Sequence, residues 1–220
     1  MADADSRTGT TYIGKQLTTW LAEQHAPQDD ALKRAYDSPV EHGIPAIHVS
    51  PSEGKLLTLL MELIGARKVV EVGTLAGYST ICLARGLADD GHLWTIEIDE
   101  EHAHIAEANI AAAGLSDRVT VLVGAAADIL NGLDTGGQVD AVFIDADKES
   151  YVEYGRWARD NTRAGGLLLG DNSALFGLLL SDEDERAEPM RRFHEEAAQA
   201  FDTVNIPTPD GLLLGIRRTA

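Results

Sequence analysis

The 220 residues, 44% of them hydrophobic, predict one globular domain with a full core. The 36 acidic and 18 basic residues give a formal net charge of -18, which argues against a nucleic-acid partner and an anionic membrane surface. No apolar run approaches the roughly 20 residues of a transmembrane helix. The polar, acidic stretch 1–10 is neither a signal peptide nor a transit peptide, and we expect it to be disordered. The single cysteine, Cys82, excludes an internal disulfide and suits a reducing cytoplasm.

Helices are expected before the first strand. A helix of about four turns is predicted by the helical spacing of Tyr12, Ile13, Leu17, Trp20 and Leu21, and a shorter helix is expected at 31–36. Ser50, Pro51 and Glu53 then make a strong helix start, because Ser can cap, Pro suits the first helical position and Glu completes a capping box. The leucine-rich helix that follows is expected to end at Gly65.

From residue 67 onward, strands and helices alternate. Strands are expected at 67–72, 93–98, 119–123, 139–144 and 166–170, and helices near 78–87, 100–113, 125–130, 148–162 and 183–200. Two closing strands, 203–206 and 212–216, flank a turn rich in Pro and Gly. The pattern predicts an α/β fold with a doubly wound, mostly parallel sheet of seven strands and helices on both faces. The final hairpin predicts one antiparallel strand at or near an edge.

A glycine turn joins the first strand to the next helix. Gly73 and Gly77 follow the β-branched strand, and such a turn holds nucleotide-like cofactors at the carboxyl edge of a parallel sheet. The spacing is Gly-x-x-x-Gly rather than the Gly-x-Gly-x-x-Gly of dinucleotide enzymes, so NAD is a weak interpretation. Glu71 would repel a pyrophosphate, and a cofactor with a cationic or hydroxyl-rich face fits better. A plain turn without a ligand is the alternative.

Other residues near this turn are candidates for cofactor contacts. Glu97 ends the second strand 24 positions after Gly73, where an acid can accept hydrogen bonds from ribose hydroxyls. A solvated acid at a strand end is the alternative. Tyr78 and Ser79 can add polar contacts, and the small residues at 124–126 suit a loop that passes close to an adenine ring.

Polar residues also follow the fourth and fifth strands. Asp145 comes directly after one, and Asp171 with Asn172 after the other. The carboxyl ends of neighbouring strands lie about 5 Å apart, so the three oxygen donors can converge on magnesium, manganese or calcium rather than zinc. Lys148 lies three residues past Asp145 and is a plausible base. The alternatives are coincidence for the three donors, and for Lys148 an exposed position beside a helix cap at Asp147.

These motifs together resemble those of the cation-dependent small-molecule O-methyltransferases, the group that contains catechol and caffeoyl-coenzyme A O-methyltransferases. The resemblance runs from about Ile47 to the C-terminus. It depends on Ser-Pro-x-Glu-Gly at 50–54, Val-Glu-Val-Gly-x3-Gly-Tyr-Ser at 70–79, Phe-Ile-Asp-Ala-Asp-Lys-x2-Tyr at 143–151, Gly-Asp-Asn at 170–172 and Asp-Gly at 210–211. Residues 1–45 resemble the family only in being predicted to form helices.

The resemblance implies a Rossmann-like methyltransferase domain at 46–220, preceded by a helical segment, 1–45, that contacts substrate or a second subunit. It implies S-adenosylmethionine as cofactor, contacted by Val49, Glu71, Gly73, Tyr78, Ser79, Glu97, Ala126 and Asp145. It also implies Mg²⁺ or another divalent cation on Asp145, Asp171 and Asn172, with Lys148 as the base. Val49 stands where relatives often have Thr, and Leu175-Phe176 where many carry Trp, so the substrate wall differs.

The implied activity is methylation of one hydroxyl of a catechol-like small molecule by a cytoplasmic homodimer. The metal would bind both oxygens of a vicinal diphenol, Lys148 would take a proton, and the phenolate would attack the sulfonium methyl. Two alternatives stay open at this point. One is an RNA-modifying methyltransferase on the same scaffold, against which the lack of a basic patch counts. The other is a nucleotide-binding or NAD-dependent protein.

Overall fold

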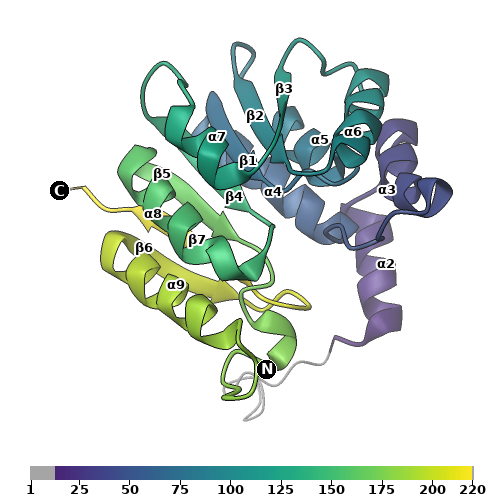
Figure 1. The fold of residues 1–220 in the computed structure, drawn as a ribbon. Coiled ribbons are helices and arrows are strands. Elements are labelled where there is room, and N and C mark those ends of the chain that lie inside the picture. The colour runs from purple at the N-terminus through teal and green to yellow at the C-terminus, as the bar shows by residue number, and fades with distance from the viewer. Residues whose placement is uncertain (1–12, 220) are drawn as a thin grey trace.

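A seven-stranded sheet forms the centre of the computed structural model, which describes residues 13–219 (Figure 1). In chain order the strands are β1 (Lys68–Val72), β2 (His92–Glu97), β3 (Val119–Val123), β4 (Val139–Ile144), β5 (Thr162–Gly170), β6 (Phe201–Ile206) and β7 (Leu212–Arg217). They lie in the order β3-β2-β1-β4-β5-β7-β6. The first five pair in parallel, whereas β7 runs antiparallel to β5 and β6, one position in from the edge. The predicted fold class is therefore confirmed.

Helices cover both faces of the sheet. The described helices are α2 (Lys15–His25), which lies against α4, and α3 (Asp30–His42), α4 (Pro51–Ile64), α5 (Tyr78–Arg85), α6 (Glu100–Ala112), α7 (Ala126–Gly132), α8 (Tyr151–Asn161) and α9 (Ala187–Ala200), with 3-10 turns η1 (Lys148–Ser150) and η2 (Leu175–Gly177). One apolar cluster joins α4, α5 and α6 to the sheet, and a second joins α7, α8 and α9 to the other face. None of the described helices combines the length and apolar character that a membrane crossing needs.

The central strands β1 and β4 are largely apolar because both of their faces are covered. Val69 belongs to the first apolar cluster, and its neighbour Val70 belongs to the second. Phe143 and Val142 divide in the same way on β4. Alternate side chains of a strand point to opposite faces, so a strand buried on both faces is apolar at most positions.

Several helix boundaries differ from the predictions. The α3 helix begins earlier because Asp29 caps it by accepting a hydrogen bond from the Leu32 amide at 3.0 Å, and it continues to His42, where Gly43 ends it at φ 71°. The helix predicted at 148–162 begins as η1, because Asp147 accepts from the Ser150 amide at 3.1 Å. The predicted disorder of 1–10 lies outside the described residues.

Two further boundaries were also predicted wrongly, and the first helix differs in length. It runs over the 11 residues Lys15–His25, about three turns where about four were predicted, and Tyr12 lies outside the described residues. The α9 helix begins at Ala187, after a turn in which Asp184 accepts from the Arg186 amide. The β5 strand begins at Thr162, four residues before the predicted 166, and its pairing with β4 is irregular there.

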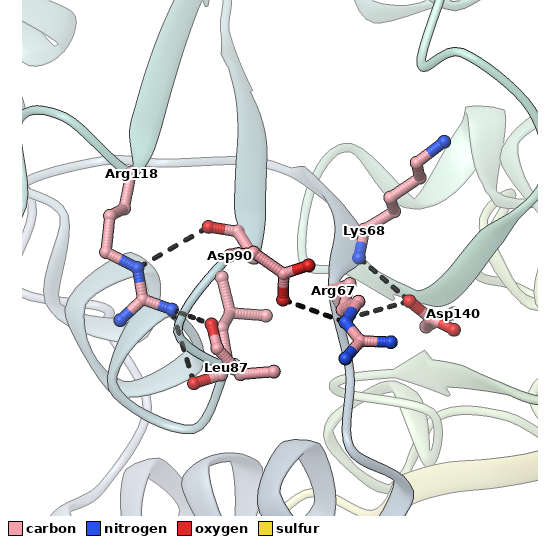
Figure 2. Close-up of polar contacts among 8 residues, drawn as sticks. Arg67, Lys68, Leu87, Asp90, Arg118 and Asp140 are labelled. Atoms are coloured by element: carbon pink, nitrogen blue, oxygen red, sulfur yellow. Dashed lines mark hydrogen bonds and ion pairs between the residues drawn. The ribbon is translucent and has the colours of Figure 1, made fainter.

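Polar contacts hold the amino edge of the sheet together (Figure 2). Asp140, near the start of β4, accepts hydrogen bonds from the amides of Arg67 and Lys68 at 2.8 Å each, which ties β4 to β1. Arg67 in turn pairs with Asp90 at 2.8 Å, and Arg118 donates to carbonyls of the loop that precedes β2. These contacts lie at the opposite end of the strands from the candidate site.

Candidate active site

A cavity of about 620 Å³ opens at the carboxyl ends of β1, β2 and β4. The strand order reverses direction next to β1, and open α/β sheets bind their ligands at such a point. Seven of the predicted site residues line this cavity: Gly73, Ser79, Glu97, Ala126, Asp145, Lys148 and Asn172. The structure therefore brings the predicted cofactor turn, two of the three predicted metal donors and the predicted base to a single cavity.

Four other predicted site residues do not line the cavity. Val49 is buried in the first apolar cluster, and Glu71 is completely buried at the end of β1. The Tyr78 hydroxyl accepts a hydrogen bond from Gln28 Nε2 at 2.6 Å, behind the cavity wall. Asp171 is 5% exposed. Their predicted contacts with cofactor or metal stay predictions.

Gly73 lets β1 and β4 approach each other closely at the cavity floor. Its φ of 96° is in the left-handed region, and a Cβ there would collide with the carbonyl of Asp145. The Asp145 amide also donates to the carbonyl of Val72 at 2.8 Å. Because no side chain fits between these segments, glycine at this position brings the cofactor turn against the residue that carries the first predicted metal donor.

Glu97 holds the glycine turn in place. Its Oε2 accepts hydrogen bonds from the amides of Thr74 at 3.2 Å and Leu75 at 2.8 Å, and its Oε1 accepts from the Asp99 amide at 3.0 Å. Leu75 has φ 50°, an uncommon value for a residue with a side chain. The carboxylate thus stabilises an unfavourable turn, a role that sequence reasoning missed because the partners lie more than twenty residues away along the chain.

Glu71 fixes the start of α5 from inside the protein. Ser79 Oγ donates to its Oε1 at 2.6 Å, and Thr80 Oγ1 donates to its Oε2 at 2.5 Å. Burial raises the pKa of Glu71 to about 7, against the opposing effect of these hydrogen bonds. Ser79 also lines the cavity, so Glu71 acts on the cavity wall through that side chain.

The predicted metal donors are close together, and their carboxylates crowd negative charge into one place. Burial raises the pKa of Asp145, and burial together with the charge of Asp145 raises the pKa of Asp171 to about 7. Asn172 lies beside them, with Nδ2 3.5 Å from Asp171 Oδ2. Glu53 and Asp210 add further negative charge, which sequence reasoning did not assign to the site. A cation would relieve this repulsion.

The donor set contains two carboxylates rather than three. Within residues 13–219, no three Asp, Glu, His or Cys side chains are arranged to hold a metal ion. An ion between Asp145 and Asp171 would therefore depend on the amide oxygen of Asn172 and on water or substrate. This composition suits a hard ion that keeps several exchangeable ligands, such as Mg²⁺.

Lys148 is not exposed, which excludes the alternative of a merely exposed side chain. Its side chain lines the cavity and the residue is 8% exposed. Its Nζ lies 2.8 Å from the Tyr151 hydroxyl and 3.4 Å from Asp145 Oδ1. Asp147 caps η1, as predicted, and accepts from the Tyr154 hydroxyl at 2.8 Å. The amine is thus held beside the predicted metal donors.

Apolar side chains surround the mouth of the cavity. Ile47, Ile98 and Phe176 line it and are largely exposed. His48 also lines it, and its ring makes an edge contact with Tyr36 at a centroid distance of 4.3 Å. Such a rim suits a flat, aromatic ligand, with the polar donors below it.

A second hollow, of about 780 Å³, is lined by residues of α8 and α9 together with Arg217 of β7. Five arginines and three glutamates line it, and some of them pair with one another. Arg156 and Arg192 both contact Glu196, at 2.6 Å and 3.0 Å. The side chains of these pairs are partly exposed, and ion pairs of this kind contribute little to stability.

Comparison with known proteins decides the family. The model of the family described as "O-methyltransferase" matches residues 22–218. The chain belongs to the O-methyltransferase family. A catechol O-methyltransferase of Niastella koreensis is 42% identical over 215 residues, which cover 93% of this chain and 97% of that protein. A catechol O-methyltransferase of Mycobacterium tuberculosis is 45% identical over 198 residues, 86% of this chain and 90% of that protein.

Solved O-methyltransferase structures share the fold. One from Bacillus cereus in complex with SAH has a TM-score of 0.88 and 36% identity, covering 92% of this chain and 97% of that one. One from Streptomyces achromogenes, involved in tomaymycin synthesis and in complex with SAM, has a TM-score of 0.88 and 35% identity, covering 93% and 96%. The predicted enzyme class, an S-adenosylmethionine-dependent O-methyltransferase, is therefore confirmed.

Proposed function

We propose that this O-methyltransferase methylates one hydroxyl of a catechol-like small molecule and needs a divalent cation to do so. The observation that carries the proposal is that Lys148, Asp145 and Asn172 line the same cavity as the glycine turn at Gly73. The names of the two catechol O-methyltransferases at 42% and 45% identity support the substrate class. A homodimer, a cytoplasmic location and the absence of nucleic-acid binding remain predictions.

The cofactor would lie along the glycine turn, between Ser79, Glu97 and Ala126. A carboxylate has about four lone-pair sites, and the Glu97 oxygens accept three amide hydrogen bonds from the turn and the following loop. One site is left for a ribose hydroxyl. Glu97 can therefore hold the turn and bind the cofactor at the same time.

The hard oxygen donors Asp145, Asp171 and Asn172 would hold the divalent ion. When bound, the ion would acidify an acceptor hydroxyl and the cofactor would supply an electrophilic methyl group. Lys148 would receive the hydroxyl proton at Nζ, since its amine lies beside Asp145 and lines the cavity. The residues otherwise orient the reactants and exclude water, which accounts for most of what a protein contributes to such a transfer.

Removal of divalent ions tests the metal requirement. The protein, treated with EDTA and desalted, should give no methylated product from a panel of catechols and S-adenosylmethionine, as measured by mass spectrometry. Addition of Mg²⁺ should restore the product, while thermal unfolding confirms that the stripped protein is folded. An undiminished rate in the stripped protein would overturn the metal-dependent reaction.

Substitution of Lys148 tests the base. Lys148→Ala should lower kcat by about 100-fold or more, within the range that proton transfer contributes, with unchanged cofactor affinity by calorimetry. Lys55→Ala, which removes an exposed lysine of α4, is the matched control and should retain the wild-type rate. Equal kcat values for Lys148→Ala and wild type would exclude the amine as the base.

A further inference from the structure

We propose that Tyr151 is a positioning residue that holds the Lys148 amine toward the acceptor. The inference rests on the proposed function, because it gives Lys148 its role as base. Tyr151 begins α8, three residues after Lys148, and its side chain is completely buried. Its hydroxyl lies where the carboxyl ends of β4 and β5 meet the base.

The Tyr151 hydroxyl has three polar neighbours. It lies 2.8 Å from Lys148 Nζ, 2.8 Å from the carbonyl of Asp171 and 3.1 Å from the carbonyl of Ile144. The same Ile144 carbonyl accepts from the Asp171 amide at 2.9 Å, at the end of the β4–β5 pairing. One oxygen atom thus links the base to both strand ends that carry the predicted metal donors.

The direction of the hydroxyl proton follows from these neighbours. Carbonyl oxygens can only accept, so the Tyr151 hydroxyl donates its hydrogen bond to the carbonyl of either Asp171 or Ile144. The tyrosine oxygen then presents a lone pair to Lys148, and the amine donates to it. Asp145 Oδ1, at 3.4 Å, is a second acceptor for this amine. Besides its bond to carbon, Nζ has three tetrahedral positions, and hydrogen bonds to Tyr151 and Asp145 occupy two of them. The remaining position is available to the cavity that Lys148 lines.

The tyrosine ring is itself held firmly. It packs against Phe193 of α9 in an edge arrangement, with ring centroids 5.2 Å apart. Lys148 Nζ also lies 4.6 Å from the centroid of the Tyr151 ring. Because the ring and its packing would survive replacement by phenylalanine, Tyr151→Phe removes the hydroxyl and little else.

Kinetics of Tyr151→Phe test the inference. We expect kcat to fall at least about tenfold, because small errors in the placement of a reacting group are costly. The KM for the catechol and the calorimetric affinity for S-adenosylmethionine should stay within about twofold of wild type. Titration of binding sites with the cofactor normalises kcat to folded protein, so a loss of stability cannot imitate the effect. An unchanged kcat would overturn the inference.

A double-mutant cycle separates positioning from packing. If Tyr151 acts through Lys148, then Tyr151→Phe should lower kcat in the wild-type background and have no further effect in Lys148→Ala. Ile110→Ala, a buried position of α6 in the first apolar cluster, is the packing control: it should lower the thermal midpoint and leave kcat within about twofold. A full additional loss in the Lys148→Ala background would show that Tyr151 does not act through the amine.

A structural readout is independent of the reaction. In a crystal structure of Tyr151→Phe, Lys148 Nζ should move away from its place beside Asp145, and an amine that keeps its position would contradict the inference. If the wild-type protein shows no metal-dependent catechol methylation, the proposed function fails. The position of the amine in the variant still decides whether Tyr151 holds it.

Discussion

At the scale of single residues, two buried glutamates at neighbouring strand ends have different functions. Glu97 accepts backbone amides and shapes the glycine turn, whereas Glu71 accepts side-chain hydroxyls and holds the start of α5. Glu71 is the more deeply buried of the two, and its pKa is raised to about 7. The charged form of Glu71 is therefore disfavoured by folding, which makes its contribution to stability dependent on pH.

We predict that Glu71→Gln becomes more stable relative to wild type as pH rises. Between its ordinary pKa of 4.5 and about 7, Glu71 keeps its proton in the folded state and loses it in the unfolded state. Stability therefore falls as pH rises through this window, by up to about 3 kcal/mol for one such group. Glutamine does not titrate, so the free energy of unfolding of Glu71→Gln should rise relative to that of wild type between pH 5 and pH 8. Urea unfolding of both proteins at the two pH values measures this difference.

The control for this measurement is Glu62→Gln, at an exposed position of α4. It reports the effect of removing one carboxylate that is not buried. If the free energy of unfolding of Glu71→Gln relative to wild type stays constant or falls between pH 5 and pH 8, the raised pKa of Glu71 is contradicted.

At the scale of elements, the start of α4 combines local capping with a contribution to the site. Ser50 Oγ accepts from the Glu53 amide at 3.3 Å, and Glu53 Oε2 accepts from the Ser50 amide at 2.9 Å, so the predicted capping box is present. Glu53 also adds to the negative charge around Asp145 and Asp171. The cap therefore places a carboxylate near the predicted metal donors.

We predict that Ser50→Ala lowers the free energy of unfolding by about 1 kcal/mol, the usual effect of losing a side-chain cap. Chemical denaturation with both variants measured in parallel is the test. Ser52→Ala, at an exposed position in the first turn of the same helix, should change stability by less than about 0.5 kcal/mol. Equal stabilities for the two variants would mean that the capping box contributes nothing.

At the scale of the whole molecule, the dominant electrostatic feature is the formal charge of -18. Several ion pairs of the described residues lie at the surface, such as Arg67–Asp90, whose side chains are 64% and 70% exposed. Surface pairs contribute little, so the mutual repulsion of the excess carboxylates should outweigh them.

We predict that sodium chloride stabilises this protein. Salt screens repulsion between exposed charges beyond about 10 Å at 0.1 M. A gain of roughly 1 kcal/mol would raise the thermal midpoint by about 2–4 °C in a chain of this size. The measurement compares the midpoint of thermal unfolding in about 0.01 M and about 0.5 M NaCl, roughly a fiftyfold range of ionic strength. Divalent ions are left out because they could bind the site. A falling midpoint would mean that ion pairs outweigh repulsion.

The sequence by itself was sufficient for the sheet, the glycine turn and the position of the candidate site. Apolar runs marked the strands because both sheet faces are covered, and parallel strands end at one edge. Asp145, Lys148 and Asn172 could therefore be assigned to one place from their positions after β4 and β5. Helix boundaries were less predictable, because several neighbouring polar residues could each cap a helix. Before α3, for example, the sequence does not show that Asp29 rather than Asp30 is the cap.

Only the tertiary structure decided which atoms meet. Three contacts join residues that lie 20 or more positions apart: the hold of Glu97 on the turn, the charge that Asp210 adds beside Asp145, and the contact between Tyr151 and the Asp171 carbonyl. A strand pattern places a residue at an edge, but the direction of its side chain depends on what packs around it. Long-range packing therefore determined how Lys148 is held, while local pattern determined where it lies.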